Sequence, residues 1–356
     1  MASKPAAAAS PAAAASPAAA SASAVAADAS KPSAPAASNT ALYDAAKTEG
    51  KVVYYSSDDP GQFDKVRQAF MARYPGIDVG SQEGRGQDAR EKIIAEQGAR
   101  RVIADVVVAG GNTMSDLIDA GFLEQYQSAE VKNLVPGVAD KRGYANPRIV
   151  NIYGITINSS VVPPQDEPKS WKDLANPKYA DKLAAQDPRG SGGGMYILAG
   201  LLEKYGDGFI EDLAKQKIFF GQNNGQLVSD VVRGEHSVLM TAASGQVALA
   251  RKDGASIKII RPEEGVVLIP ISMAVVKNAP HPNAARLFID YMLSEEGQKI
   301  VADNGDTPAR AGVRARDPEG DLNGATVLSM TYDGTDRQAT VDLTKKWESL
   351  FFKKNS

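Results

Sequence analysis

The feature that most constrains this fold is an alternation of short β-rich runs with helical patterns, interrupted twice by long β-rich stretches that contain no helix. One alternating series covers residues 51–123 and a second covers residues 182–254. The interruptions are residues 148–163 and 265–280. Alternation of this kind predicts parallel strands joined by right-handed crossovers within each series. We therefore expect an α/β chain with two lobes, and a hinge made of the two long β runs that cross between them.

The domain prediction that follows has four parts. Lobe 1 takes residues 40–154 and 270–310, lobe 2 takes residues 155–269, and residues 311–356 form a C-terminal helical segment that the sequence assigns to neither lobe. Residues 1–39 are nearly all Ala, Ser and Pro, with too little apolar surface to fold. We interpret them as a disordered tail; a degenerate secretory signal and a stretch of artificial origin are the other two interpretations. Thr40 is the predicted N-cap of the first helix.

Composition argues against several functions. The net charge is -3, from 40 basic and 43 acidic residues, so no overall field attracts nucleic acid or an anionic membrane. The absence of cysteine excludes thiol catalysis and disulfides, and two histidines are too few for a histidine-built metal site. Since no histidine or acid pair converges in the strand-end motifs, we expect no enzyme, no cofactor and no resident metal. A transferase on a two-lobe scaffold is the alternative from another class, and turnover of a phospho-compound would support it.

The most informative motif is the run RGSGGGMY at residues 189–196, which places four glycines and one serine between a predicted strand and a predicted helix. The first N–H groups of a helix lack partners and carry the positive end of its dipole, so they attract anions. Glycine lets the main chain approach a bulky oxyanion closely. A flexible joint is the plain alternative. The position at a helix entrance favours an anion site at Ser191, Gly192 and Gly193.

Other candidate ligand residues lie near the ends of predicted strands, because ligands of open α/β sheets bind outside the carboxyl ends of the strands. In lobe 1 they are Ser56, Ser57, Asp58, Arg85 and Gly111. In lobe 2 they are Asn223, Thr241 and Ser244, which are neutral donors, and the first hinge run adds Tyr153. Asn223 and Asp58 are also common helix caps, so a structural role is the alternative for both.

Several fragments together resemble one protein family. They are, in chain order, KVVYYSS, RYPGIDV, ADVVVAGG, YGITINSS, SWKDLANPKYADKL, GEHSVLMTAAS, VVKNAPHPNAARLFIDYMLSEEGQKIVADNG and TPAR, and they span roughly residues 50–310. Their order and spacing resemble extracellular solute-binding proteins of ABC importers, in the ferric-ion-binding-like branch of type 2 periplasmic binding proteins. The resemblance implies a two-lobe fold with a two-strand hinge and an inter-lobe ligand cleft. It also implies a periplasmic monomer that delivers its solute to an ABC permease at the inner membrane, and anion contacts from the glycine loop and an asparagine near Asn223.

The sequence departs from that branch at the iron site. Ferric-binding members use two adjacent tyrosines just after the strand that corresponds to HSVLMTAAS, where this chain has Ala243, Ser244 and Gly245. Ferric iron prefers hard, anionic oxygen ligands, which these side chains do not supply. We therefore predict capture of a small anionic organic solute, with phosphonate, phosphate ester and carboxylate as candidates. Binding of ferric iron or another metal through Asp58, Glu83 or Tyr153 is the alternative.

Overall fold

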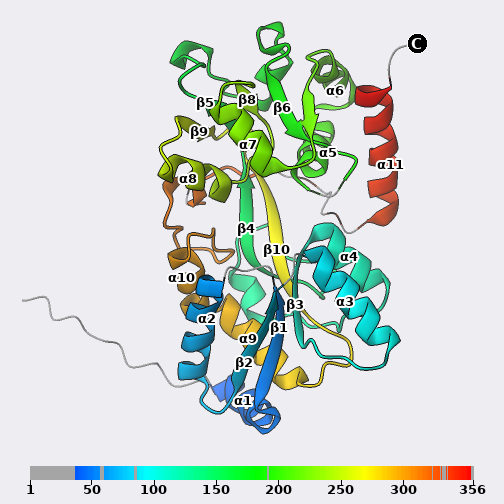
Figure 1. Cartoon of the computed structure of the whole chain (residues 1–356), viewed down its shortest axis with the longest axis vertical. Helices are drawn as coiled ribbons and strands as arrows, with labels where there is room; N and C mark the ends of the chain where they lie inside the picture. The colour runs from blue at the N-terminus through cyan, green and yellow to red at the C-terminus, as the bar shows by residue number, and fades with distance from the viewer. Residues whose placement is uncertain are drawn as a thin grey trace, which may run out of the picture. The chain divides into compact units, whose positions relative to one another are not determined.

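Helices and strands alternate along much of the chain (Figure 1). The computed structural model describes residues 37–56, 60–83, 86–190, 192–322, 324–328, 330, 334 and 336–353. The strands are β1 (Lys51–Ser56), β2 (Asp78–Glu83), β3 (Val106–Gly110), β4 (Asn146–Tyr153), β5 (Ile155–Asn158), β6 (Leu183–Gln186), β7 (Phe219–Gly221), β8 (Val238–Leu239), β9 (Ile257–Ile260) and β10 (Val267–Val275). The helices are α1 (Ala37–Glu49), α2 (Pro60–Arg73), α3 (Gly86–Gly98), α4 (Gly111–Asp119), α5 (Gly193–Tyr205), α6 (Asp207–Ala214), α7 (Asn224–Val232), α8 (Ser244–Lys252), α9 (Pro282–Leu293), α10 (Glu295–Asp303) and α11 (Arg337–Trp347).

The first lobe is built on a five-stranded sheet in the order β2-β1-β3-β10-β4. Strand β1 pairs in parallel with β2 and β3, as the alternating pattern predicts. Strand β10 runs antiparallel to both β3 and β4. The strands of the alternating series are therefore parallel and the whole sheet is mixed, because the strand that returns from the second lobe enters it in the opposite direction.

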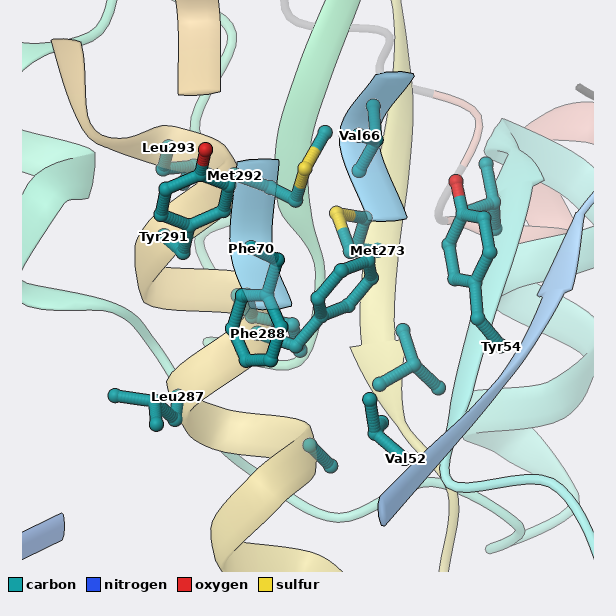
Figure 2. Close-up of a cluster of buried hydrophobic side chains, with 14 of the residues drawn as sticks. Val52, Tyr54, Val66, Phe70, Met273, Leu287, Phe288, Tyr291, Met292 and Leu293 are labelled. Atoms are coloured by element: carbon teal, nitrogen blue, oxygen red, sulfur yellow. The ribbon is translucent and has the colours of Figure 1, made fainter. Parts of the chain in front are cut away.

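Both faces of this sheet are buried, and one of them carries a cluster of aromatic side chains among aliphatic ones (Figure 2). Phe70 of α2 makes edge-on contacts with Phe288 and Tyr291 of α9, with ring centroids 5.1 and 5.4 Å apart. Tyr54 joins this cluster, while Tyr55, the next residue of β1, packs into the core on the opposite face. Successive strand residues point to opposite faces, so one Tyr-Tyr pair anchors helices on both sides of the sheet.

The second lobe contains the other five-stranded sheet, in the order β7-β6-β8-β5-β9. Strand β6 is parallel to β7 and β8, and β5 is antiparallel to β8 and β9. Trp171, Ile155 and Leu183 lie in its core, and no more than 1% of the surface of each residue is exposed. The predicted strand HSVLMTAAS is shortened to Val238–Leu239, and the predictions did not include β9.

Two strands connect the lobes. Strands β4 and β10 lie side by side, with Tyr153 opposite Val267 and Asn146 opposite Met273 (Figure 1). The register shifts between Ile271 and Ser272. Irregularities of this kind bend and twist a strand pair. The chain then continues from β4 into β5 through Gly154, which has no room for a side chain because a β-carbon would lie 2.5 Å from the carbonyl oxygen of Ile260.

The C-terminal segment divides between the lobes. Ala309 accepts a hydrogen bond from the main-chain N–H of Val135, and the Ala311 N–H donates to Asn133, so these residues stay with the first lobe. Leu328 and Trp347 are buried in the core of the second lobe, where the indole N–H of Trp347 lies 3.3 Å from the sulfur of Met195. Helix α11 thus packs on α5 (Figure 1).

Two helix boundaries differ from the sequence prediction. The apolar spacing of the run PNAARLFIDYMLSEEGQKIVADNG predicts one amphipathic helix, but Ser294 takes an extended conformation and separates α9 from α10. Its hydroxyl accepts from the Gly297 N–H and so caps α10. Helix α1 begins at Ala37, before the predicted cap Thr40. The rest of the predicted tail, residues 1–36, lies outside the described residues.

Candidate functional site

The carboxyl ends of three neighbouring strands meet at one edge of the second sheet. Strands β6, β7 and β8 are mutually parallel, and α5, α7 and α8 begin directly after them. We name this region the second-lobe edge, defined by Gln186, residues 192–196, residues 222–224 and residues 241–244. Five of the predicted ligand residues lie there: Gly192, Gly193, Asn223, Thr241 and Ser244. Ligands of α/β sheets bind at such an edge.

The glycines at this edge are required by close packing. Gly192 has φ +136, and a β-carbon on it would lie 2.6 Å from the side-chain oxygen of Gln186. A β-carbon on Gly194 would lie 2.1 Å from the Gln186 main-chain oxygen. On Gly193 it would lie 2.9 Å from the ring of Tyr153. The bare backbone therefore has a structural reason of its own, beyond any approach of a ligand.

The entrance of α5 nevertheless has free donors. Tyr196 makes the first helical bond, from its N–H to the carbonyl of Gly192 at 3.3 Å. The N–H groups of Gly193 and Gly194 have no acceptor among the residues that the structure describes. The helix behind them has 13 residues, and its dipole places partial positive charge at this end. Such a pair of amides attracts an anion. Ser191 lies outside the described residues.

Tyr153 connects the hinge to this helix entrance. It is the last residue of β4, forms an isolated β-bridge with Ala243, and is 6% exposed. Burial raises the pKa of Tyr153 to about 12. In the described part of the chain its hydroxyl forms no hydrogen bond. At neutral pH Tyr153 is therefore a neutral donor beside Gly193, and a poor source of the phenolate that ferric iron prefers.

The polar side chains at the second-lobe edge are linked to one another. Thr241 accepts from the Gln186 main-chain N–H at 2.8 Å and donates to the Asn224 side-chain oxygen at 2.9 Å. Its hydroxyl hydrogen is used, and the residue is 1% exposed, so direct donation from Thr241 to a ligand is not proposed further. Asn223 caps α7 by accepting from the Gln226 N–H, while its amide nitrogen points to no acceptor among described residues. Ser244 is 3% exposed in the first turn of α8.

Arg189 has a supporting role. Its guanidinium donates to both carboxylate oxygens of Asp187, at 3.0 and 2.6 Å, and lies 3.7 Å from the ring centroid of Phe352. The hydrogen bond from Arg189 is the main cause that lowers the pKa of Asp187. Gln222 donates to the same carboxylate at 2.9 Å. Asp187 is thus fully occupied and fixes the loop that leads into the glycines.

In the first lobe, two of the predicted residues can be placed. Ser56 is the last residue of β1 and is 4% exposed, and Gly111 is the first residue of α4 at the end of β3. Ser57, Asp58 and Arg85 lie outside the described residues, as does the side chain of Glu83. The structure therefore describes the second-lobe half of the predicted site more fully than the first.

A cavity of about 90 Å³ joins the two lobes beside the hinge. Gly111 and Arg142 line it from the first lobe, Ser272 from β10 and Tyr196 from α5. Arg142 was not predicted, because it lies in an irregular loop before β4 and does not follow the carboxyl end of a strand. Its guanidinium contacts Asp119 at 3.1 Å and the Ser115 hydroxyl at 3.2 Å, so it is charge-balanced. The first turn of α5 thus faces the first lobe.

Solved structures share this two-lobe architecture. Iron-bound HitA from Pseudomonas aeruginosa superposes with a TM-score of 0.68 at 22% identity, covering 83% of this chain and 98% of that one. AfuA from Actinobacillus pleuropneumoniae, solved with exogenous fructose-6-phosphate bound, gives a TM-score of 0.65 at 22% identity, covering 85% and 98%. The fold is that of the two-lobe, type 2 periplasmic binding proteins.

Sequence comparison assigns the family. Residues 102–337 match the family model described as bacterial extracellular solute-binding protein. A putative 2-aminoethylphosphonate-binding periplasmic protein of Salmonella typhimurium is 24% identical over 253 residues, which cover 68% of this chain and 71% of the relative. The chain belongs to the bacterial extracellular solute-binding protein family, whose members serve ABC transporters. In the described part of the chain, no helix is long and apolar enough to cross a membrane.

Proposed function

We propose that this protein captures a small anionic organic solute between its lobes, in the periplasm, and delivers it as a monomer to an ABC permease at the inner membrane. The observation that carries the proposal is the pair of N–H groups at Gly193 and Gly194, which have no acceptor within the described part of the chain and lie beside the neutral hydroxyl of Tyr153. Hydrogen bonds to an ionised group are the strong ones, and closure of the lobes would strengthen them by excluding water. No catalytic role is proposed.

Phosphonates and phosphate esters are the preferred ligand classes. The relative from Salmonella typhimurium is named for 2-aminoethylphosphonate, and AfuA was solved with fructose-6-phosphate. Both names concern other proteins, but both ligands carry a tetrahedral oxyanion that suits a helix entrance. Lobe 1 would complete the site with Ser56 and Gly111, and with Ser57, Asp58 and Arg85.

Ferric iron is the weaker candidate cargo. Ala243 and Ser244 occupy the first turn of α8, where no phenolate is available, and Tyr153 is protonated at neutral pH. Within the described residues, acidic and histidine side chains form no group of three that would hold a metal ion. These observations support an organic anion over a metal.

A thermal-shift screen tests the proposal. The purified protein is heated with inorganic phosphate, 2-aminoethylphosphonate, fructose-6-phosphate, citrate or a ferric salt. Ligand at about 100 times its dissociation constant adds about 2.7 kcal/mol of stability, which raises the melting temperature by several degrees. An oxyanion hit is expected. A shift with ferric salt alone, together with a new visible absorption band, would replace the organic anion by iron.

A further inference from the structure

Gln186 places its side-chain amide against the candidate anion site. It is the last residue of β6, and its side-chain oxygen lies so close to Gly192 that a β-carbon there would be 2.6 Å away. Gly192 directly precedes the two amides proposed to hold the anion. Any group attached to that anion on this side therefore comes within reach of the Gln186 amide.

A chain of hydrogen bonds fixes which way this amide faces. It starts at the Gln186 main-chain N–H, passes through the Thr241 hydroxyl and the Asn224 amide, and reaches the Gln186 side-chain oxygen, with the last bond at 3.4 Å. The Gln186 amide nitrogen then donates to the Gln222 main-chain carbonyl at 3.5 Å. Because the chain begins at an N–H and ends at a carbonyl, only one direction satisfies every member. Thr241 and Asn224 are therefore positioning residues for Gln186.

The oriented amide still has capacity for a ligand. One N–H and one oxygen lone pair of Gln186 have no partner among the described residues, and its two existing bonds are near the upper limit of length. Asp187, the adjacent carboxylate, is saturated by Arg189 and Gln222. This side of the cleft thus offers a donor and an acceptor together, and no free negative charge for an ammonium group.

We propose that Gln186 recognises a hydroxyl group carried by the anionic solute, and so selects hydroxylated phosphonates or phosphate esters over aminoalkyl ones. A hydroxyl donates and accepts at once, and so matches both free positions of the amide. An ammonium group only donates, and an alkyl group does neither. The inference rests on the proposed function, since the anion must first bind at Gly193 and Gly194.

The test uses three ligands that differ in one group: 2-hydroxyethylphosphonate, 2-aminoethylphosphonate and ethylphosphonate. Their dissociation constants are measured by isothermal titration calorimetry with the full chain. The wild-type protein should bind the hydroxyl ligand about 10- to 100-fold more tightly than the ethyl ligand, because closure over the ethyl ligand would leave the Gln186 amide without water or a partner. Gln186→Met, which keeps the length of the side chain, should abolish that preference and leave ethylphosphonate affinity within about threefold.

Gln226→Met is the matched control. Its side chain donates to Asp230 on α7 and lies outside the second-lobe edge, so the hydroxyl preference should persist. Equal affinities for the three ligands in the wild type, tightest binding of the amino ligand, or an unchanged preference in Gln186→Met would each overturn the assignment of Gln186. Failure of every phosphonate and phosphate ester to bind would overturn the proposed function as well, which distinguishes the two failures.

Discussion

The ring of Tyr153 lies directly against Gly193, so the end of a hinge strand contacts the entrance of the helix that is proposed to hold the anion. A β-carbon on Gly193 would lie 2.9 Å from Cε1 of that ring and 3.3 Å from the β-carbon of Thr241. The close approach means that the position of the free amides depends on the hinge strand. Ligand capture and hinge geometry are therefore linked through one contact.

Two substitutions of Gly193 separate the contribution of its N–H to anion binding from the effect of crowding by an added β-carbon. Gly193→Ala and Gly193→Pro both add a β-carbon that crowds Tyr153, and proline is sterically acceptable at the first helical position. Each should lower the free energy of unfolding by about 1–3 kcal/mol through overpacking. Proline alone removes the N–H, so it should weaken anion binding about tenfold relative to alanine. Calorimetric titration with the best ligand of the screen measures this, and equal affinities in the two variants would exclude the amide from the site.

The alkaline stability profile reports on Tyr153. Burial raises its pKa to about 12 from 10.0, so the folded state binds its proton more tightly than the unfolded state. The associated stability is complete below the unfolded pKa and is lost as the pH rises through the folded pKa. The wild-type free energy of unfolding should fall between about pH 10 and pH 12, and in Tyr153→Phe this fall should be smaller by about 2–3 kcal/mol. Urea unfolding across this range measures the difference, and parallel curves for variant and wild type would contradict the prediction.

The buried Asp105 holds three donors in the first lobe. It accepts from the Val53 N–H at 2.7 Å, from the His281 N–H at 2.7 Å, and contacts the His281 ring nitrogen at 2.9 Å. Burial is the largest influence on its pKa and raises it. Asp105→Ala leaves these donors unsatisfied and should lower the free energy of unfolding by about 3 kcal/mol. Urea titration of the variant and the wild type measures this difference.

The control for this variant is Asp212→Ala, which removes an exposed ion pair with Lys215 on the second lobe. It should change stability by no more than about 0.5 kcal/mol. A loss of similar size in both variants would mean that the three donors of Asp105 find other partners in the folded protein.

Trp347 tests the contribution of the C-terminal helix to the second lobe. Its side chain is 0% exposed, so Trp347→Ala should cost about 3–5 kcal/mol. Val341 on the same helix is 40% exposed, and Val341→Ala should change stability by no more than about 0.5 kcal/mol. Chemical unfolding followed by circular dichroism compares them. An unchanged free energy of unfolding in Trp347→Ala would show that α11 does not stabilise this core.

Much of the fold was predictable because the spacing of apolar residues alternates, along each lobe, between the pattern of a strand and the pattern of a helix. The long β runs stood out as strands without helices, and they became β4, β5 and β10. The break at Ser294 was not predictable from the pattern, since the apolar spacing continues through it and only the local cap interrupts the helix. The sequence made no prediction for the direction of β10, because periodicity identifies a strand but not the neighbours with which it pairs.

The candidate site could be predicted from the sequence less completely than the fold. Strand ends located Gly193, Asn223 and Thr241 at one edge, because parallel strands bring their ends together. Whether a side chain is available to a ligand depends on its tertiary neighbours. The Thr241 hydroxyl, for example, already forms hydrogen bonds with Gln186 and Asn224 of the same lobe. Gln186 was not singled out, although its place as the last residue of a strand before DPRG was a usable signal.

Neither lobe is a continuous piece of polypeptide, and this has a consequence for how the molecule must be made. The first sheet stays open until translation has passed Val275, because β10 fills the place between β3 and β4. The second core lacks one of its two tryptophan side chains until Trp347 has been synthesised. A nascent chain that ends before Val275 therefore contains two lobes, each of which still lacks a buried element of its core.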